Sequence, residues 1–192
     1  MFAQQPTRLS RRIAAVAILA PLALVLTQGP RIPFPLLPFL TMELWEIPVY
    51  FSLMVLDAKT ALTVEGIVYI AVQILVPGVL PFGPVYNLVA VISTIGGAVV
   101  GFKALAGRIR IPVAIALGTA VRTAVMILFN SIFLPLKYPF GFNVPLSKLD
   151  PGVSGPVVLG FIGLFNAVVA AYSLVFAAIL AKAVSRRLRA GQ

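Results

Sequence analysis

Two carboxylates and an indole lie close together in the stretch from Pro30 to Pro48. Glu43, Trp45 and Glu46 follow a proline-rich, strongly apolar segment that reads PRIPFPLLPFL. Proline forbids a regular helix over that segment, and an apolar loop exposed to water is unusual. Carboxylates accept hydrogen bonds from a bound molecule, and an indole offers an apolar face to a flat ring. We therefore interpret the stretch as part of a binding site or its lid, with these three residues as substrate-binding candidates.

Three asparagines, Asn87, Asn130 and Asn166, interrupt long apolar runs. Amide side chains are costly in a bilayer, so each is a functional candidate. At about 1.5 Å of rise per helical residue, all three fall in the outer half of the membrane or near its middle. This arrangement is expected for a cavity that is open to the outside and holds a polar heterocycle or a sugar-like ligand. The alternative is that the asparagines join helices through hydrogen bonds. Aromatic walls could come from Phe39, Trp45, Tyr86, Tyr138, Phe140 and Phe142.

The composition is that of an integral membrane protein. Of 192 residues, 60% are hydrophobic and only 10% are charged, which leaves room for about six spans of roughly 20 residues each. The chain has no cysteine and no histidine, so disulfides, histidine-based hydrolysis and a histidine metal site are excluded. The net charge of +10 is interpreted as membrane orientation and headgroup anchoring, not as nucleic-acid binding. We expect a multi-pass protein of the cell membrane.

The apolar runs predict an all-α, polytopic fold of six transmembrane helices, with residues 1–192 forming a single membrane domain. Proline and glycine clusters and short polar turns separate the runs. The first run is interpreted as a retained helix, with a signal peptide as the alternative. The predicted helices cover residues 12–27, 42–56, 60–76, 85–102, 111–134 and 155–181.

The distribution of basic residues predicts the orientation. With six spans and both termini cytoplasmic, eleven basic residues lie inside and three outside, as the positive-inside rule requires. Arg122 remains within the fifth helix, and Glu65 lies within the third. These two could form a structural pair, or a switch between the cavity and the cytoplasmic face. The inner set is Arg8, Arg11, Arg12, Lys59, Lys103, Arg108, Arg110, Lys182, Arg186, Arg187 and Arg189; the outer set is Arg31, Lys137 and Lys148.

Small residues predict close helix contacts. Ala14, Ala17 and Ala20 recur every third residue in the first helix and form either an internal contact or a docking face for another membrane protein. Gly97 and Gly101 are four residues apart in the fourth helix, a spacing that favours internal packing.

Three phrases resemble the substrate-binding S components of energy-coupling factor (ECF) vitamin transporters, particularly the riboflavin-type group. They lie in the order and at the spacing of that family, and the likeness covers nearly the whole chain. Glutamates stand in place of both family aspartates in the first phrase, and the third lacks the family's proline and lysine. The phrases are Phe39-Leu40-Thr-Met-Glu43-Leu-Trp-Glu46-Ile47-Pro48, Arg122-Thr123-Ala-Val-Met126-Ile-Leu-Phe-Asn130 and Leu164-Phe165-Asn166.

The resemblance implies a substrate-capture subunit that binds a vitamin from outside, with riboflavin as the best candidate. The vitamin would be cargo, so no cofactor and no metal are expected, and the chain would not be an enzyme. It has no phosphate-binding loop of the Gly-x-x-x-x-Gly-Lys-Ser/Thr type, so ATP hydrolysis would fall to two separate ATPase subunits. A membrane coupling subunit would dock on Ala14, Ala17 and Ala20. The 30–48 and 135–154 segments would gate the site.

Two other functions remain open. A lipid-modifying membrane enzyme would need clustered acids for a metal or for proton transfer, and only Glu43 and Glu46 are close in the sequence. A stand-alone secondary transporter is the other alternative, although no inverted repeat is visible.

Overall fold

The protein is a polytopic helical membrane protein, as the sequence predicts. The computed structural model describes residues 8–75, 81–104, 107–141 and 154–190. Within these ranges, five helices are long and apolar enough to cross a membrane, and one shorter apolar helix accompanies them. The long helices are α1 (Arg8–Thr27), α3 (Ala58–Leu75), α4 (Gly83–Ala104), α5 (Arg110–Phe133) and α6 (Gly155–Ala190), and the short one is α2 (Glu46–Val55).

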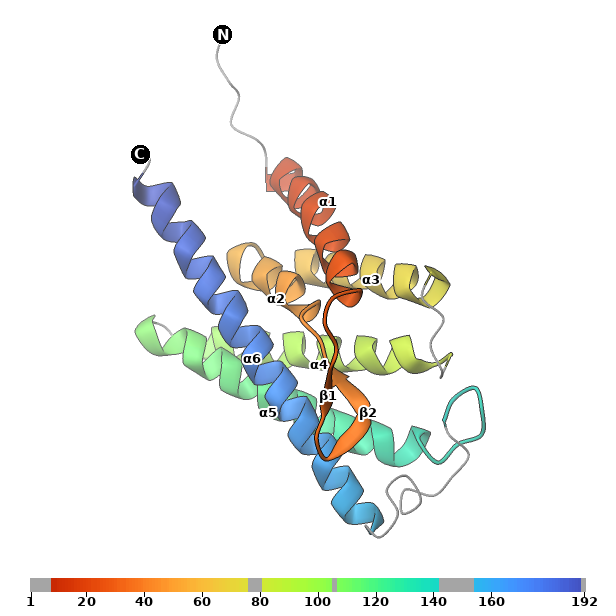
Figure 1. The fold of residues 1–192 in the computed structure, drawn as a ribbon. Helices are drawn as coiled ribbons and strands as arrows, with labels where there is room; N and C mark the ends of the chain where they lie inside the picture. Colours follow the sequence, from red (N-terminus) through yellow and green to blue (C-terminus); the bar gives the residue numbers. More distant parts are fainter. Residues whose placement is uncertain (1–7, 76–80, 105–106, 142–153, 191–192) are drawn as a thin grey trace.

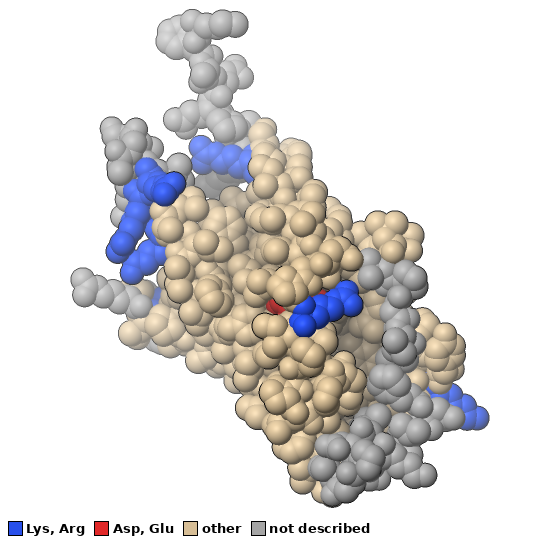
Figure 2. All heavy atoms as spheres, viewed as in Figure 1, with Lys and Arg blue, Asp and Glu red and all other residues tan. Residues whose placement is uncertain are grey.

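The outer surfaces of the long helices are apolar, as contact with lipid requires. Large hydrophobic side chains stay exposed on every one of them. Figure 2 shows basic side chains gathered near the start of α1 and the end of α6, with a broad uncharged surface between these ends and the hairpin region. Those two helix ends lie at the same end of the bundle (Figure 1). The count of six spans and the cytoplasmic location of the termini stay predictions. Exposed examples are Ile18, Ile70, Ile74, Val100, Leu128 and Ile179.

The proline-rich stretch folds differently from the all-α prediction. Strands β1 (Ile32–Phe34) and β2 (Leu37–Met42) form an antiparallel hairpin, with Ile32 opposite Met42 and an irregular register after Pro33. The prolines remove backbone donors that a helix needs but are tolerated in edge strands, and both strands of a two-stranded sheet are edges. The hairpin buries Phe34 and Leu37 against α6 and the end of α5.

Three helix limits also differ from the prediction. Helix α2 begins at Glu46 instead of residue 42, because the second strand occupies residues 37–42. Helix α1 begins earlier, at Arg8, and α6 extends beyond residue 181 to Ala190. Arginine, leucine and alanine, which are frequent at those two ends, are good helix formers, so the helices continue past their apolar cores.

Helices α4 and α5 lie side by side and approach each other closely (Figure 1). A Cβ atom on Gly97 would lie 2.5 Å from the carbonyl oxygen of Leu117, and one on Gly101 would lie 2.5 Å from the Cα of Ala114. Only glycine permits this spacing, so the prediction of internal packing for the two glycines is confirmed. Helix α6 crosses α5 and α2, while α1 packs on α2 and α3.

A polar turn joins α2 to α3. Asp57 Oδ1 accepts hydrogen bonds from the backbone N–H and hydroxyl of Thr60, at 2.9 and 3.1 Å, in the manner of a helix N-cap. Its Oδ2 lies 2.6 Å from the guanidinium of Arg12 on α1. Burial tends to raise the pKa of Asp57, but the bonds from Thr60 and the charge of Arg12 outweigh it and lower that pKa below the ordinary value. The turn therefore ties α1 to the start of α3.

Replacing Asp57 by alanine is expected to destabilise the protein by about 1 kcal/mol, the usual cost of a lost N-cap. Because the pKa is lower in the folded state, the ionised carboxylate contributes stability above the ordinary aspartate pKa, and this contribution disappears as pH falls through the folded-state pKa. Thermal unfolding in detergent between pH 2 and pH 7 measures both effects. An Asp57→Ala variant that loses as much stability on acidification between pH 4 and pH 2 as the parent would contradict this account.

Candidate functional site

A cavity of about 560 Å³ lies between the hairpin and helices α2 to α6. Its volume is in the range of sites that hold small organic molecules. Apolar and aromatic side chains form most of its wall, and a few charged and amide side chains project among them. The lining residues that carry polar groups or rings are Thr27, Arg31, Phe39, Thr41, Glu43, Trp45, Glu46, Glu65, Tyr69, Tyr86, Asn87, Arg122, Asn130 and Phe165.

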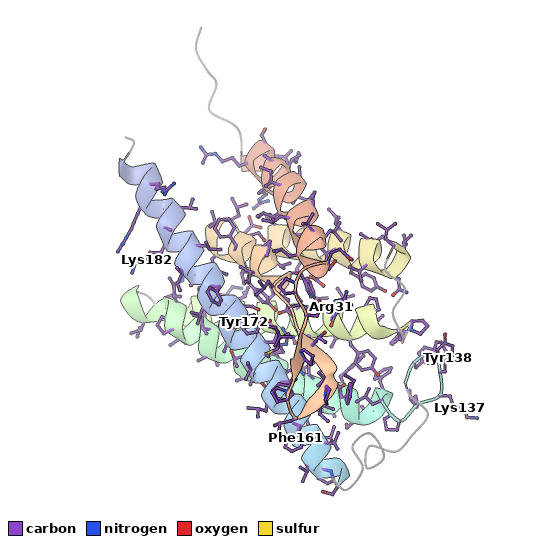
Figure 3. The ribbon with its side chains drawn as sticks, in the orientation of Figure 1. Arg31, Lys137, Tyr138, Phe161, Tyr172 and Lys182 are labelled. Carbon is purple, nitrogen blue, oxygen red and sulfur yellow. The ribbon has the colours of Figure 1, made fainter. Side chains whose placement is uncertain are left out.

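The mouth of the cavity carries one ion pair. Arg31 Nε, just before the hairpin, lies 3.1 Å from Glu43 Oε1, just after it. Burial is the largest influence on the pKa of Glu43 and raises it, although Arg31 and Thr41 act in the opposite direction. The hydroxyl of Tyr172 on α6 donates to the backbone carbonyl of Glu43. Figure 3 labels Arg31 and Tyr172 on either side of the hairpin's base, and Figure 2 shows a small acidic patch beside a basic side chain there.

A second ion pair is buried at the base of the cavity. Arg122 on α5 contacts both carboxylate oxygens of Glu46, with Nη1 2.5 Å from Oε2 and Nη2 3.0 Å from Oε1. The Tyr50 hydroxyl donates to Glu46 Oε2 at 3.0 Å, and Arg122 Nε donates to Asn166 Oδ1 at 3.0 Å. Two-point contact and further hydrogen bonds offset the free energy that is lost when two charges are removed from water. This network joins α2, α5 and α6.

Glu65 belongs to the same wall but not to this network. It is 2% exposed and lines the cavity from α3. Arg122 therefore pairs with Glu46, and no ion pair joins it to Glu65 among the described residues. The Oε2 atom of Glu65 has no hydrogen-bond partner in the described part of the chain.

The predicted substrate-binding residues divide into two groups. Glu43, Trp45 and Glu46 line the cavity together with two of the asparagines, Asn87 and Asn130. The third asparagine, Asn166, is not among the lining residues. It lies behind Arg122, and its Nδ2 donates to the backbone carbonyl of Ile162 at 2.9 Å. The structure thus places Asn166 where it can orient Arg122.

Three charged lining side chains were missing from the predicted binding set. Arg122 and Glu65 carried a usable signal, because ionisable groups within apolar runs of a membrane protein are functional candidates. Arg31 carried none, since a single basic residue in an external loop is common.

The aromatic prediction is confirmed in part. Phe39, Trp45 and Tyr86 line the cavity, whereas Tyr138 and Phe140 do not. The Tyr86 hydroxyl instead donates to the backbone carbonyl of Phe140 at 3.0 Å and fastens that loop to α4. Phe142 lies outside the described residues.

The alanine stripe on α1 is divided between two surroundings. Ala14 and Ala17 are exposed, whereas Ala20 is only 2% exposed and belongs to the core formed with α2 and α3. Two of the three predicted docking residues are therefore available on the outer surface of α1.

Comparison with known proteins identifies the fold. No protein-family model matches the chain, and no curated protein matches it by sequence. A solved structure of the S component of a bacterial ECF transporter superposes with a TM-score of 0.74. The superposition covers 93% of this chain and 97% of that one, at 20% sequence identity. The chain therefore has the fold of an ECF transporter S component.

Proposed function

We propose that this protein is the substrate-capture subunit of an ECF-type transporter and binds a vitamin, riboflavin being the best candidate. A membrane coupling subunit and two ATPase subunits would supply the energy for uptake. The observation that carries the proposal is the 560 Å³ cavity with aromatic and amide side chains under a hairpin, in a chain with this fold.

The lining side chains suit a flat, polar heterocycle. Trp45 is 5% exposed overall yet lines the cavity, so its indole offers a face on which a ring can stack. Asn87 and Asn130 supply amide groups that match carbonyl and N–H groups of a ligand. Glu43 and Arg31 form an ion pair at the mouth of the cavity, above the bound ligand. Asn166 acts through Arg122, which it holds in place.

The partner surface is proposed on α1. Ala14 and Ala17 are exposed small residues on a membrane-facing helix, which allow another helix to approach closely. Ala20 supports the same helix from its buried side by packing against the core.

Purified protein is expected to carry a flavin, seen as a visible absorbance band and identified by mass analysis. After removal of any bound ligand, riboflavin should quench the fluorescence of Trp45 with submicromolar affinity. Trp45 is the only tryptophan in the chain, so the signal reports this cavity alone. Absence of both signals would contradict the flavin assignment.

Asn130→Ala should weaken binding by about 10-fold, the upper range for one hydrogen bond. Ser131→Ala is the matched control, since Ser131 is the next residue, bonds only the backbone of Leu128 in the described structure, and does not line the cavity. Equal loss in both variants would show that the helix, not the amide group, is responsible.

Uptake of the substrate into membrane vesicles distinguishes a capture subunit from a stand-alone transporter. If the chain is a capture subunit, uptake requires the ATPase partners and ATP. Uptake by the chain alone, lost when the ion gradient collapses, would establish a secondary transporter instead.

A further inference from the structure

Glu65 is a buried acid that the helix packing does not use. It lies seven residues after Ala58, about 10 Å along α3 at 1.5 Å per residue. Its side chain is 2% exposed and lines the cavity, and its Oε2 makes no hydrogen bond to the described residues. An unpartnered buried polar group destabilises the folded state, because it has lost its hydrogen bonds to water without replacing them. Because Glu65 destabilises the folded state in this way, we look for a role of Glu65 other than packing.

Within the described residues, the neighbouring ion pair uses its hydrogen-bonding groups on one another and on Tyr50 and Asn166, and none of them pairs with Glu65. Both terminal nitrogens of Arg122 contact Glu46, and its Nε contacts the Asn166 amide. Tyr50 completes the coordination of Glu46. The network is thus satisfied without Glu65, and the described part of the cavity wall contains two buried acids for one buried cation.

We propose that Glu65 is a ligand-binding and specificity-determining residue, whose carboxyl group accepts a hydrogen bond from a ring N–H of the substrate. The inference rests on the function proposed above. For a flavin, the donor is the imide N–H between the two ring carbonyls, the only ring N–H of the oxidised isoalloxazine. Carboxyl oxygens accept such bonds in either protonation state.

The surroundings favour a ligand over other partners for Glu65. A metal ion is not indicated, because no group of three or more acidic side chains surrounds a common point among the described residues. Val64, its neighbour on α3, is apolar and completely buried, whereas Val68, about one turn further on, lines the cavity beside Glu65. The open side of Glu65 is therefore the cavity, where Trp45 and Tyr69 also line the wall.

The test compares riboflavin with 3-methylriboflavin, in which a methyl group replaces the imide hydrogen. Binding to the full chain in detergent is measured by Trp45 fluorescence. The parent protein is expected to prefer riboflavin at least 10-fold, because the methylated ring leaves the carboxyl group unpaired. Glu65→Leu should reduce the preference to about 2-fold or less, and Glu65→Gln, which keeps an acceptor oxygen, should restore part of it.

Val64→Ala is the matched control, since it loosens the same turn of α3 without removing the carboxyl group. It should lower thermal stability and keep the preference. Equal binding of both flavins by the parent, or an unchanged preference in Glu65→Leu, overturns the assignment of Glu65 alone. If the parent binds neither flavin, the proposed substrate is wrong, and the hydrogen bond between Glu65 and the imide N–H falls with it. The failure of the substrate assignment is thus distinguishable from the failure of the Glu65 assignment alone.

Discussion

Replacing Arg122 by leucine is expected to destabilise the protein by about 3–5 kcal/mol, the usual cost of removing one member of a buried ion pair. The change leaves Glu46 buried with the Tyr50 hydroxyl as its one remaining side-chain partner in the part of the chain that the structure describes. It also frees the Asn166 amide oxygen, which Arg122 Nε occupies in the native protein. The midpoint of thermal unfolding in detergent, followed by aggregation or by Trp45 fluorescence, measures the loss.

The double variant Glu46→Leu with Arg122→Leu provides the decisive comparison. Because both charges disappear together, it should be more stable than Arg122→Leu alone. Glu43→Gln breaks the more exposed pair with Arg31 and should cost no more than about 1 kcal/mol. Glu46→Leu and Arg122→Leu are also measured separately. If the stability lost in the double variant equals the sum of these two losses, the two members of the buried pair are not coupled as the structure requires.

Gly97→Ala should destabilise the protein by about 1–3 kcal/mol, the usual cost of overpacking a tight contact. The new Cβ would lie 2.5 Å from the Leu117 carbonyl oxygen and 2.9 Å from the Cα of Gly118. Both are backbone atoms of α5, so relief requires the two helices to separate. Thermal unfolding measures the effect, and weaker riboflavin binding should accompany it because α4 and α5 both line the cavity.

Gly96→Ala is the matched control one position earlier. A Cβ atom there meets nothing within 4 Å, and alanine is favoured over glycine in a helix by up to about 1 kcal/mol. The two neighbouring substitutions should therefore change stability in opposite directions. If both raise the unfolding midpoint, α4 and α5 do not approach as closely as the structure shows.

The spans were predictable because each is a long apolar run bounded by proline, glycine or basic residues. Helices α3, α4 and α5 begin and end within two residues of their predicted limits. The hairpin was not predictable in the same way. Its prolines excluded a helix but did not indicate a pairing partner, and the burial of Phe34 and Leu37 depends on α5 and α6, which are distant in the sequence.

Depth along a helix was the other partial guide. It placed Glu43, Glu46 and the three asparagines at similar levels, but it carries no information on which way each side chain faces. The sequence suggested Glu65 as a partner of Arg122, whereas the structure pairs Arg122 with Glu46. That pairing depends on the rotation of each helix about its axis. The same limit applies to Asn166, whose level fits the cavity although its side chain contacts Arg122.

The shortness of α2 has a consequence for how the cavity is enclosed. Ten residues rise only about 15 Å, about half the thickness of a typical hydrocarbon core. The first residue of α2, Glu46, lines the cavity. The hairpin and the cavity therefore take the place of the further helical turns that a full-length span would have there.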